Sequence, residues 1–125
     1  MKDFSGRFES SDITKNLHDA LIDLYSSNIL SFHIRRNNNH TEESKGYEVW
    51  GIYHEPKDVV FFYKNILKRE MSKMGYSWGT LKMLKKAGML HIDRKDYLTS
   101  QIMVNGKRLG LIAVELNSKE REEEL

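Results

Sequence analysis

Apolar side chains recur at helical spacing in three stretches of this chain. In the first stretch, residues 12–26, the stripe consists of Ile13, Leu17, Leu21, Leu24 and Tyr25. A repeat of three and four residues places such side chains on one face of a helix. The pattern therefore predicts one helix over residues 12–26, a second over Tyr63–Met74 and a third between Gly75 and Gly88.

The third stretch carries the signals of a complete short helix. Ser77 suits the N-cap, because its hydroxyl can accept a hydrogen bond from a backbone N–H one turn later. Gly88 suits the left-handed position that closes a helix, with Leu90 folding back on Leu84. The apolar stripe consists of Trp78, Leu81 and Leu84. The opposite side, which contains no acid, holds Tyr76, Gly79, Lys82, Met83 and Lys86.

Other stretches predict strands. Ile29–Arg36 alternates, with Leu30, Phe32 and Ile34 on one side, and predicts a short strand. The next residues, 37–46, are polar without periodicity and predict a loop. Glu48–Tyr53 and Asp58–Phe62 are rich in β-branched and aromatic residues and flank the only proline, which predicts a hairpin. Met89–Ile92 predicts one or two further strand residues.

The C-terminal part predicts a second hairpin whose register follows from its turn. Leu98–Val104 and Lys107–Leu116 flank Asn105-Gly106, the dipeptide most favoured in a two-residue type I′ turn. This turn pairs Val104 with Lys107, Ile102 with Leu109 and Ser100 with Leu111. The same alternation predicts an inner face formed by Leu98, Ile102, Leu109, Leu111 and Ala113.

The order of these elements is typical of a winged helix. In this α+β fold a helix-turn-helix is followed by a β-hairpin wing; here an N-terminal helix and a β-hairpin precede it. We expect one such domain over residues 10–117. Residues 1–9 are predicted to be a linker or a loosely docked arm, and residues 118–125 a solvated acidic tail.

Charge is divided sharply along the chain, although the formal net charge is only +2. Between Lys57 and Arg108 lie twelve lysines and arginines and four acids, whereas the remainder holds eight basic and fourteen acidic residues. A basic block of this kind favours a polyanionic partner. The alternative is a generally lysine-rich composition, but that would not exclude acids from one segment.

Length, cysteine content and the lengths of the apolar runs indicate which class of protein to expect. The chain has 125 residues, which is one domain's worth, and no cysteine. Its apolar runs are too short to cross a bilayer, and its N-terminus lacks the apolar core of a secretory signal. We therefore expect a cytoplasmic protein with no membrane partner.

Catalytic chemistry has no support in the sequence. There is no phosphate-binding loop and no dinucleotide-binding glycine motif. The five histidines lack the spacing of metal ligands, and His18 is expected at the surface of the first helix. We expect no catalytic residue, no metal and no cofactor, so that the chain by itself is not an enzyme.

The basic third helix and the hairpin together predict contact with duplex DNA. A recognition helix presents its first half to base edges, while lysines contact phosphates. Trp50 and Trp78 are expected in the core rather than as platforms for bases. The predicted contact residues are Tyr76, Thr80, Lys82, Met83, Lys86, Gln101, Lys107 and Arg108.

Three motifs between about residues 47 and 116 resemble the C-terminal domain of a helicase family. They are Val49-Trp50-Gly51-Ile52-Tyr53, Asp58-Val59-Val60-Phe61-Phe62 before a helix, and Leu81-x-x-Leu84-x-x-x-Gly88-Met89-Leu90. The family comprises self-loading AAA+ replicative helicases encoded by phages and Gram-positive genomic islands. The resemblance implies a winged-helix appendage that helps a replication initiator engage DNA, such as its origin, with the AAA+ core as a partner. It does not imply ATP hydrolysis or unwinding, because this sequence holds no ATPase core.

Two other functions fit the same pattern. A free-standing transcriptional regulator would need a dimer interface to read a palindrome, and the first helix is the only candidate for it. A winged helix used for docking another protein would instead make use of Met83 and exposed aromatic side chains.

Overall fold

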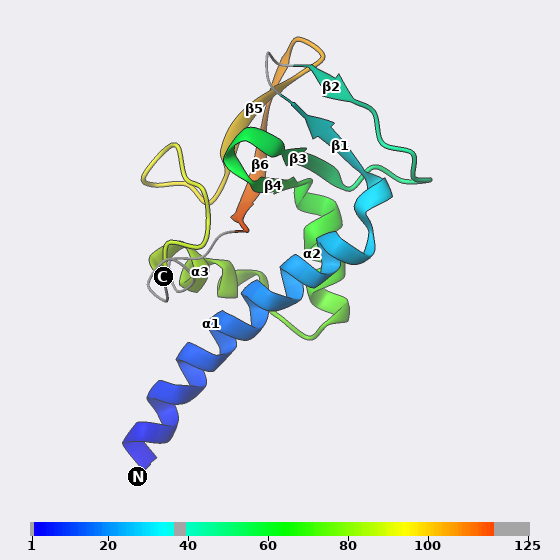
Figure 1. The fold of residues 1–125 in the computed structure, drawn as a ribbon. Coiled ribbons are helices and arrows are strands. Elements are labelled where there is room, and N and C mark those ends of the chain that lie inside the picture. The colour runs from blue at the N-terminus through cyan, green and yellow to red at the C-terminus, as the bar shows by residue number, and fades with distance from the viewer. Residues whose placement is uncertain (1, 37–39, 117–125) are drawn as a thin grey trace.

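The computed structural model describes the backbone of residues 2–36 and 40–116, and within these ranges the side chains from residue 13 onward. The predicted acidic tail, residues 118–125, lies outside the described residues. No helix in the described ranges combines the length and the apolarity that crossing a membrane requires. The described chain has a mixed α+β fold with three α-helices and one six-stranded sheet (Figure 1).

The helices are α1 (Lys2–Ser27), α2 (Lys64–Lys73) and α3 (Leu81–Lys86). Short 3₁₀ turns precede β1, β4 and α3, and they are η1 (Ile29–Ser31), η3 (Glu55–Lys57) and η4 (Trp78–Thr80). The strands are β1 (Phe32–Arg35), β2 (Thr41–Glu42), β3 (Gly51–His54), β4 (Val59–Phe62), β5 (Ser100–Val104) and β6 (Lys107–Glu115).

The strands form one sheet in the order β2-β1-β3-β4-β6-β5. Neighbours run antiparallel except β1 and β3, which are parallel. The sheet is curled, so that its two edge strands, β2 and β5, approach each other near the top of Figure 1. Arg35 of β1 crosses the remaining gap and donates a hydrogen bond to the backbone carbonyl of Met103 on β5.

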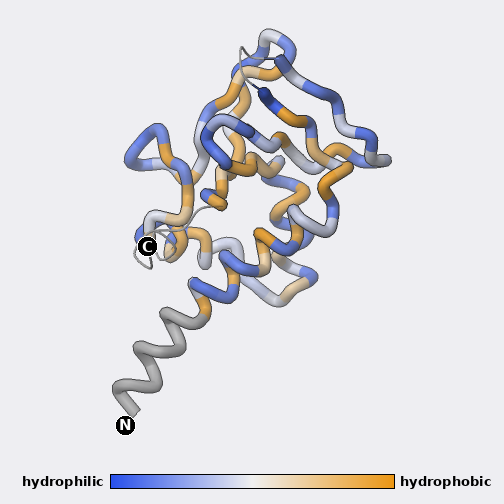
Figure 2. The backbone as a smooth tube through the Cα atoms, in the orientation of Figure 1, coloured by the Kyte–Doolittle hydropathy of each residue, from blue (hydrophilic) through white to orange (hydrophobic). Residues whose placement is uncertain are grey.

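Each face of the sheet buries its own cluster of apolar side chains. One face packs against the helices, whose buried side chains include Leu17, Leu21, Leu67, Met71, Leu81 and Leu84. The opposite face buries Ile52, Val59, Phe61, Ile102, Leu111 and Ala113. Because β4 contributes to both clusters, all four of its residues are buried. In Figure 2 the central strands are largely hydrophobic, and the loop between α3 and β5 is largely hydrophilic.

Helix α1 begins at Lys2, well before the start predicted at residue 12. The predicted linker or arm, residues 1–9, therefore has helical backbone from Lys2 onward; it contains no proline that would interrupt a helix. His18 on this helix is buried, which corrects its predicted place at the surface. Its Nε2 donates a hydrogen bond of 2.6 Å to the backbone carbonyl of Glu115, and this bond links α1 to β6.

The region after α1 contains a 3₁₀ turn and a strand pair that the alternation of apolar and polar residues did not predict. The strand predicted over Ile29–Arg36 is shortened to β1, because its first residues form η1. Leu30 is exposed whereas Phe32 is buried, so the two do not share one side as predicted. The predicted loop 37–46 contains β2, which pairs antiparallel with β1. Residues 37–39 lie outside the described residues. Pairing with β1 imposes this short strand, since residues 41 and 42 carry no alternation of their own.

Both predicted hairpins form, and the second has the predicted register from Val104–Lys107 to Ser100–Leu111. Asn105 and Gly106 have φ of 51° and 80°, as a type I′ turn requires. Leu90 bridges Val114, in agreement with the short strand predicted there. Leu98 is an exception, because it packs on the face that the helices cover.

The second hairpin is attached to the rest of the sheet, unlike a wing that projects freely. Strand β6 pairs with β4 along one side and with β5 along the other, so the body of the hairpin belongs to the sheet. Within the hairpin, only the tip, residues 105–108, has several exposed residues in succession.

Candidate nucleic-acid interface

Helices α2 and α3 are joined by a turn, and we call residues 64–88 the α2–α3 corner. A glycine closes each of the two helices. Gly75 follows α2 with φ of 86°, and Tyr76 N–H donates a 2.9 Å hydrogen bond back to the last turn of that helix. Gly88 follows α3 with φ of 76°, and Met89 N–H donates a 3.0 Å bond to the carbonyl of Leu84. In this Schellman arrangement a left-handed residue allows the next N–H groups to satisfy the last helical carbonyls. The turn predicted at Gly75 and the closing position predicted for Gly88 are confirmed.

The start of the third helix differs from the prediction. Ser77 makes no side-chain capping bond, and its Oγ lies 3.2 Å from Oγ1 of Thr80 instead. The first turn is the 3₁₀ turn η4, so α3 begins only at Leu81. The chain therefore enters α3 through a 3₁₀ turn in which the Ser77 hydroxyl pairs with Thr80 and does not cap the backbone.

The side chains of α3 are buried on one side and exposed on the other, as the periodicity predicted. Leu81 and Leu84 are completely buried, and Trp78 packs against the same core. Lys82 and Lys86 are exposed on the helix surface. Neither η4 nor α3 contains an acidic residue, so the exposed face of this helix is positively charged.

Three predicted contact residues are less available than expected, because Tyr76, Thr80 and Met83 are only partly exposed. Tyr76 is partly buried and packs against the core beneath the helices. Met83 is also partly buried. The lysines of α3 therefore supply most of its exposed chemistry.

Helix α2 adds two lysines that were absent from the predicted contact set. Lys64 and Lys68 are exposed and lie four residues apart, which places them on one face of α2. This spacing was visible in the sequence and could have identified them.

Other basic residues near the corner are already paired. Glu70 is the only acid between Lys64 and Lys86, a stretch with seven lysines and arginines. Its carboxylate accepts from Arg69 at 2.8 Å and from Lys73 at 3.2 Å. Arg69 also binds Glu48 at 2.9 Å, and this hydrogen bond is the main reason why the pKa of Glu48 is lowered. The unneutralised charge of the corner therefore lies on the exposed lysines.

The predicted hairpin residues lie elsewhere. Gln101, Lys107 and Arg108 are exposed, but only Lys107 and Arg108 lie at the hairpin tip, which is at the opposite end of β5 and β6 from α3 (Figure 1). Gln101 lies near the start of β5, where its N–H donates to Asp93 of the loop after α3. The five residues of β5 correspond to a length of about 15 Å. The structure thus does not bring Lys107 and Arg108 into one patch with the predicted helix residues, and a ligand that touched both groups would have to follow the hairpin.

Comparison of the chain with models of known protein families finds no match, and comparison with characterised proteins finds none at the sequence level. The resemblance to helicase C-terminal domains therefore stands on the three motifs alone. In the described part of the chain, no three His, Asp or Glu side chains are placed to hold a metal ion. Charge and exposure at the α2–α3 corner are the features that indicate a function.

Proposed function

We propose that this chain binds duplex DNA through the exposed lysines of the α2–α3 corner. The observation that carries the proposal is the division of α3, with Leu81 and Leu84 buried and Lys82 and Lys86 exposed on an acid-free helix. Lysines that neutralise phosphates release counterions, and this release supplies most of the affinity of such surfaces for DNA.

The connectivity supports the interpretation of the fold as a winged helix. The elements α1, β4, α2, α3, β5 and β6 follow one another in the order of that fold, and β4, β6 and β5 are neighbours in the sheet. Strands β1 to β3 then form an insertion after the first helix. In this proposal α3 is the recognition helix, and the hairpin tip with Lys107 and Arg108 is the wing.

The resemblance of the motifs extends the proposal to DNA replication. The chain would be the DNA-engaging domain of a self-loading AAA+ replication initiator of a mobile element, acting in the cytoplasm. The ATPase core of that initiator would be its partner. A dimeric regulator is less favoured, because Leu17 and Leu21 of α1 are completely buried in the core and cannot form a second interface.

A second candidate function is docking of another protein, and a separate surface with exposed apolar side chains supports it. Ile29, Leu30 and Tyr47 are all exposed apolar side chains. Lys45 N–H donates a hydrogen bond to the carbonyl of Leu30, which holds the two segments together. Apolar side chains grouped in this way are a feature of protein contact surfaces.

Fluorescence anisotropy with a labelled duplex tests the DNA proposal. The double variant Lys82→Ala/Lys86→Ala is expected to bind about tenfold more weakly, because two phosphate contacts are lost. Lys45→Ala is the matched control, since this exposed lysine lies on the β2–β3 connection, away from α3 (Figure 1). Equal loss of affinity in both, or no loss in the double variant, would contradict the proposal. The docking alternative predicts that Tyr47→Glu abolishes a partner complex and leaves DNA binding unchanged.

A further inference from the structure

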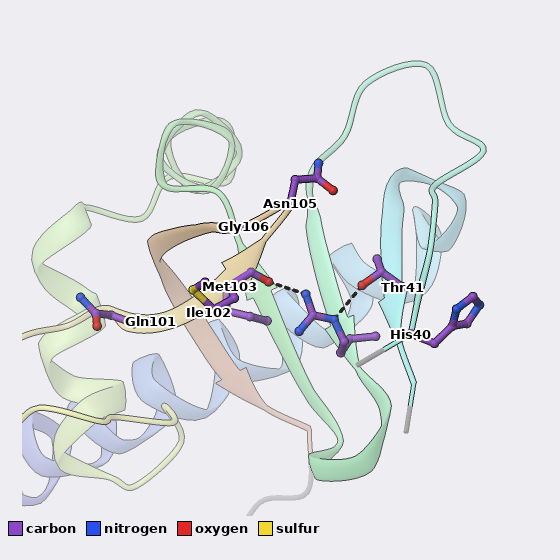
Figure 3. A pocket seen from close by; sticks show the side chains of 8 residues that line it. His40, Thr41, Gln101, Ile102, Met103, Asn105 and Gly106 are labelled. Carbon is purple, nitrogen blue, oxygen red and sulfur yellow. Dashed lines mark hydrogen bonds between the residues drawn. The ribbon is translucent and has the colours of Figure 1, made fainter. Parts of the chain in front are cut away.

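A buried arginine lies between the two edges of the curled sheet. Arg35 has only 9% of its surface exposed. Its Nε donates to Oγ1 of Thr41 at 2.7 Å, and its Nη2 donates to the backbone carbonyl of Met103 (Figure 3). These bonds use two of the five N–H donors that a guanidinium carries.

Both acceptors of Arg35 are neutral, which is unusual for a buried charge. Burying a charge without an opposite charge is unfavourable, so buried arginines are normally paired with carboxylates. Within the described residues, Arg36 pairs with Glu42 and Glu55, whereas Arg35 has no carboxylate partner. His54 is the residue that pairs with Arg35 in the register of β1 and β3. Burial, then the charge of Lys57 and then the charge of Arg35 lower the pKa of His54.

The guanidinium lines a cavity of about 660 Å³ between β2 and β5, and none of the described residues that line this cavity is acidic. Asn105 and Gly106 of the hairpin turn and His40 beside β2 also line it (Figure 3). Glu43 lines two smaller cavities, of which one shares Thr41 and Asn105 with this cavity.

Strand β5 adds backbone donors on the same side. In the register of the hairpin, Val104 and Lys107 close the turn as a hydrogen-bonded pair, so the backbone groups of Met103 and Gln101 point away from β6. Two contacts agree with this geometry, because the Met103 carbonyl accepts from Arg35 and Gln101 N–H donates to Asp93 at 2.7 Å. The N–H of Met103 therefore faces the gap between the sheet edges.

We propose that this cavity binds a phosphate group, with the guanidinium of Arg35 as its anchor. A phosphate oxygen would receive the remaining N–H donors of Arg35 and supply the negative charge that the site lacks. Charge-assisted bonds from a planar guanidinium to phosphate are among the strongest hydrogen bonds that proteins make. The proposal does not depend on the α2–α3 corner, which is formed by other elements.

Titration with sodium phosphate, followed by ¹H–¹⁵N NMR at constant ionic strength, tests the site. Saturable shifts are expected at the Arg35 Nε–H and at the amides of Thr41, Met103 and Gly106, with none in a chloride titration. Absence of saturable shifts at these groups, or equal shifts at surface lysines, would overturn the proposal.

Two matched pairs of variants assign the binding. Arg35→Met is expected to weaken phosphate binding about tenfold or more, whereas Arg36→Met, which removes the same charge one residue later, should not weaken it. If Arg35→Met fails to fold, the second pair decides, because both of its members tolerate the positive φ of residue 105. Asn105→Asp brings a carboxylate to the cavity and should abolish binding, while Asn105→Gly should retain most of it. Equal affinity in Asn105→Asp and Asn105→Gly would refute the assignment.

Two further ligands identify the source of the phosphate. Adenosine 5′-monophosphate carries a monoester, and thymidylyl-thymidine carries only a diester. Preference for the diester would indicate a nucleic-acid strand, and preference for the monoester a nucleotide or free phosphate. The Lys82→Ala/Lys86→Ala variant should bind phosphate in this cavity as the wild type does, so failure of the DNA proposal and failure of this one are distinguishable.

Discussion

Gly51 on β3 has no room for a side chain against the neighbouring strand β4. A Cβ at this position would lie 1.9 Å from the backbone carbonyl oxygen of Phe61. Neither partner can move easily, because β3 and β4 are paired along their whole length. Gly51→Ala is therefore expected to lower the free energy of unfolding by about 3 kcal/mol or more. Urea denaturation measures the effect, and a change of less than about 1 kcal/mol would show that the backbones can separate.

Single substitutions on α3 separate the core from the contact surface. Leu84 is completely buried, so Leu84→Ala should lower the free energy of unfolding by about 2–5 kcal/mol. Lys82 is exposed, and Lys82→Ala should change it by less than about 0.5 kcal/mol. Thermal or urea unfolding of both variants checks the orientation of the helix; a stability loss confined to Lys82→Ala would mean that the orientation is wrong.

His54 couples stability to pH. Burial, then Lys57 and Arg35, lower its pKa below the ordinary value of 6.5, with a smaller effect of His91. In the described structure its Nδ1 is buried without a hydrogen-bond partner. The unfolded chain therefore takes up a proton at His54 before the folded chain does. This contribution to stability is present above about pH 6.5 and is lost as the pH falls through the depressed pKa.

His54→Phe tests this coupling, since it keeps a ring next to Phe61 and removes the titration. Between about pH 7.5 and pH 5.5, the range over which histidine titrates, the urea midpoint of the wild type should fall. The midpoint of the variant should fall less over the same range. An equal fall in both proteins would assign the pH dependence to other groups.

At the scale of elements, the β5–β6 hairpin combines a structural body with an exposed tip. Strand β6 is paired on both sides, whereas Lys107 and Arg108 at its beginning are exposed. Stability and ligand contact should therefore respond to different residues of one hairpin.

Gly106→Ala and the double variant Lys107→Ala/Arg108→Ala separate these two roles. A Cβ on Gly106 meets no atom within 4 Å, so its cost arises from the φ of 80° and should be about 1–2 kcal/mol. The double variant should leave the unfolding temperature unchanged and weaken duplex binding if the tip acts as a wing. Calorimetry and anisotropy measure the two effects; unchanged DNA affinity would restrict the tip to a structural role.

At the scale of the whole molecule, the division of charge predicts strong salt dependence. In this proposal the exposed lysines of α2 and α3, together with Lys107 and Arg108 of the hairpin tip, contact phosphates. If about four to six of them make contacts, the logarithm of the DNA affinity should fall linearly with the logarithm of salt concentration, with a slope of about −4 to −5. Anisotropy titrations at several salt concentrations check this slope. Binding that is independent of salt would exclude a phosphate-contacting surface.

The sequence by itself determined the local structure wherever one pattern had one solution. Asn105-Gly106 requires positive φ at two successive residues, and this alone set the register of the last hairpin. Gly75 and Gly88 likewise marked two helix ends, and the spacing of Leu81 and Leu84 identified the buried side of α3. These features depend on backbone conformation and periodicity, which are properties of neighbouring residues.

Only the tertiary structure decided the features that join distant parts of the chain. The pairing of β2 with β1, the burial of His18 against Glu115, and the meeting of Arg35 with Met103 all depend on how the sheet curls. No local pattern records that curl, because it results from strand twist accumulated over six strands. For the same reason the basic corner was visible in the sequence, whereas the cavity around Arg35 was not.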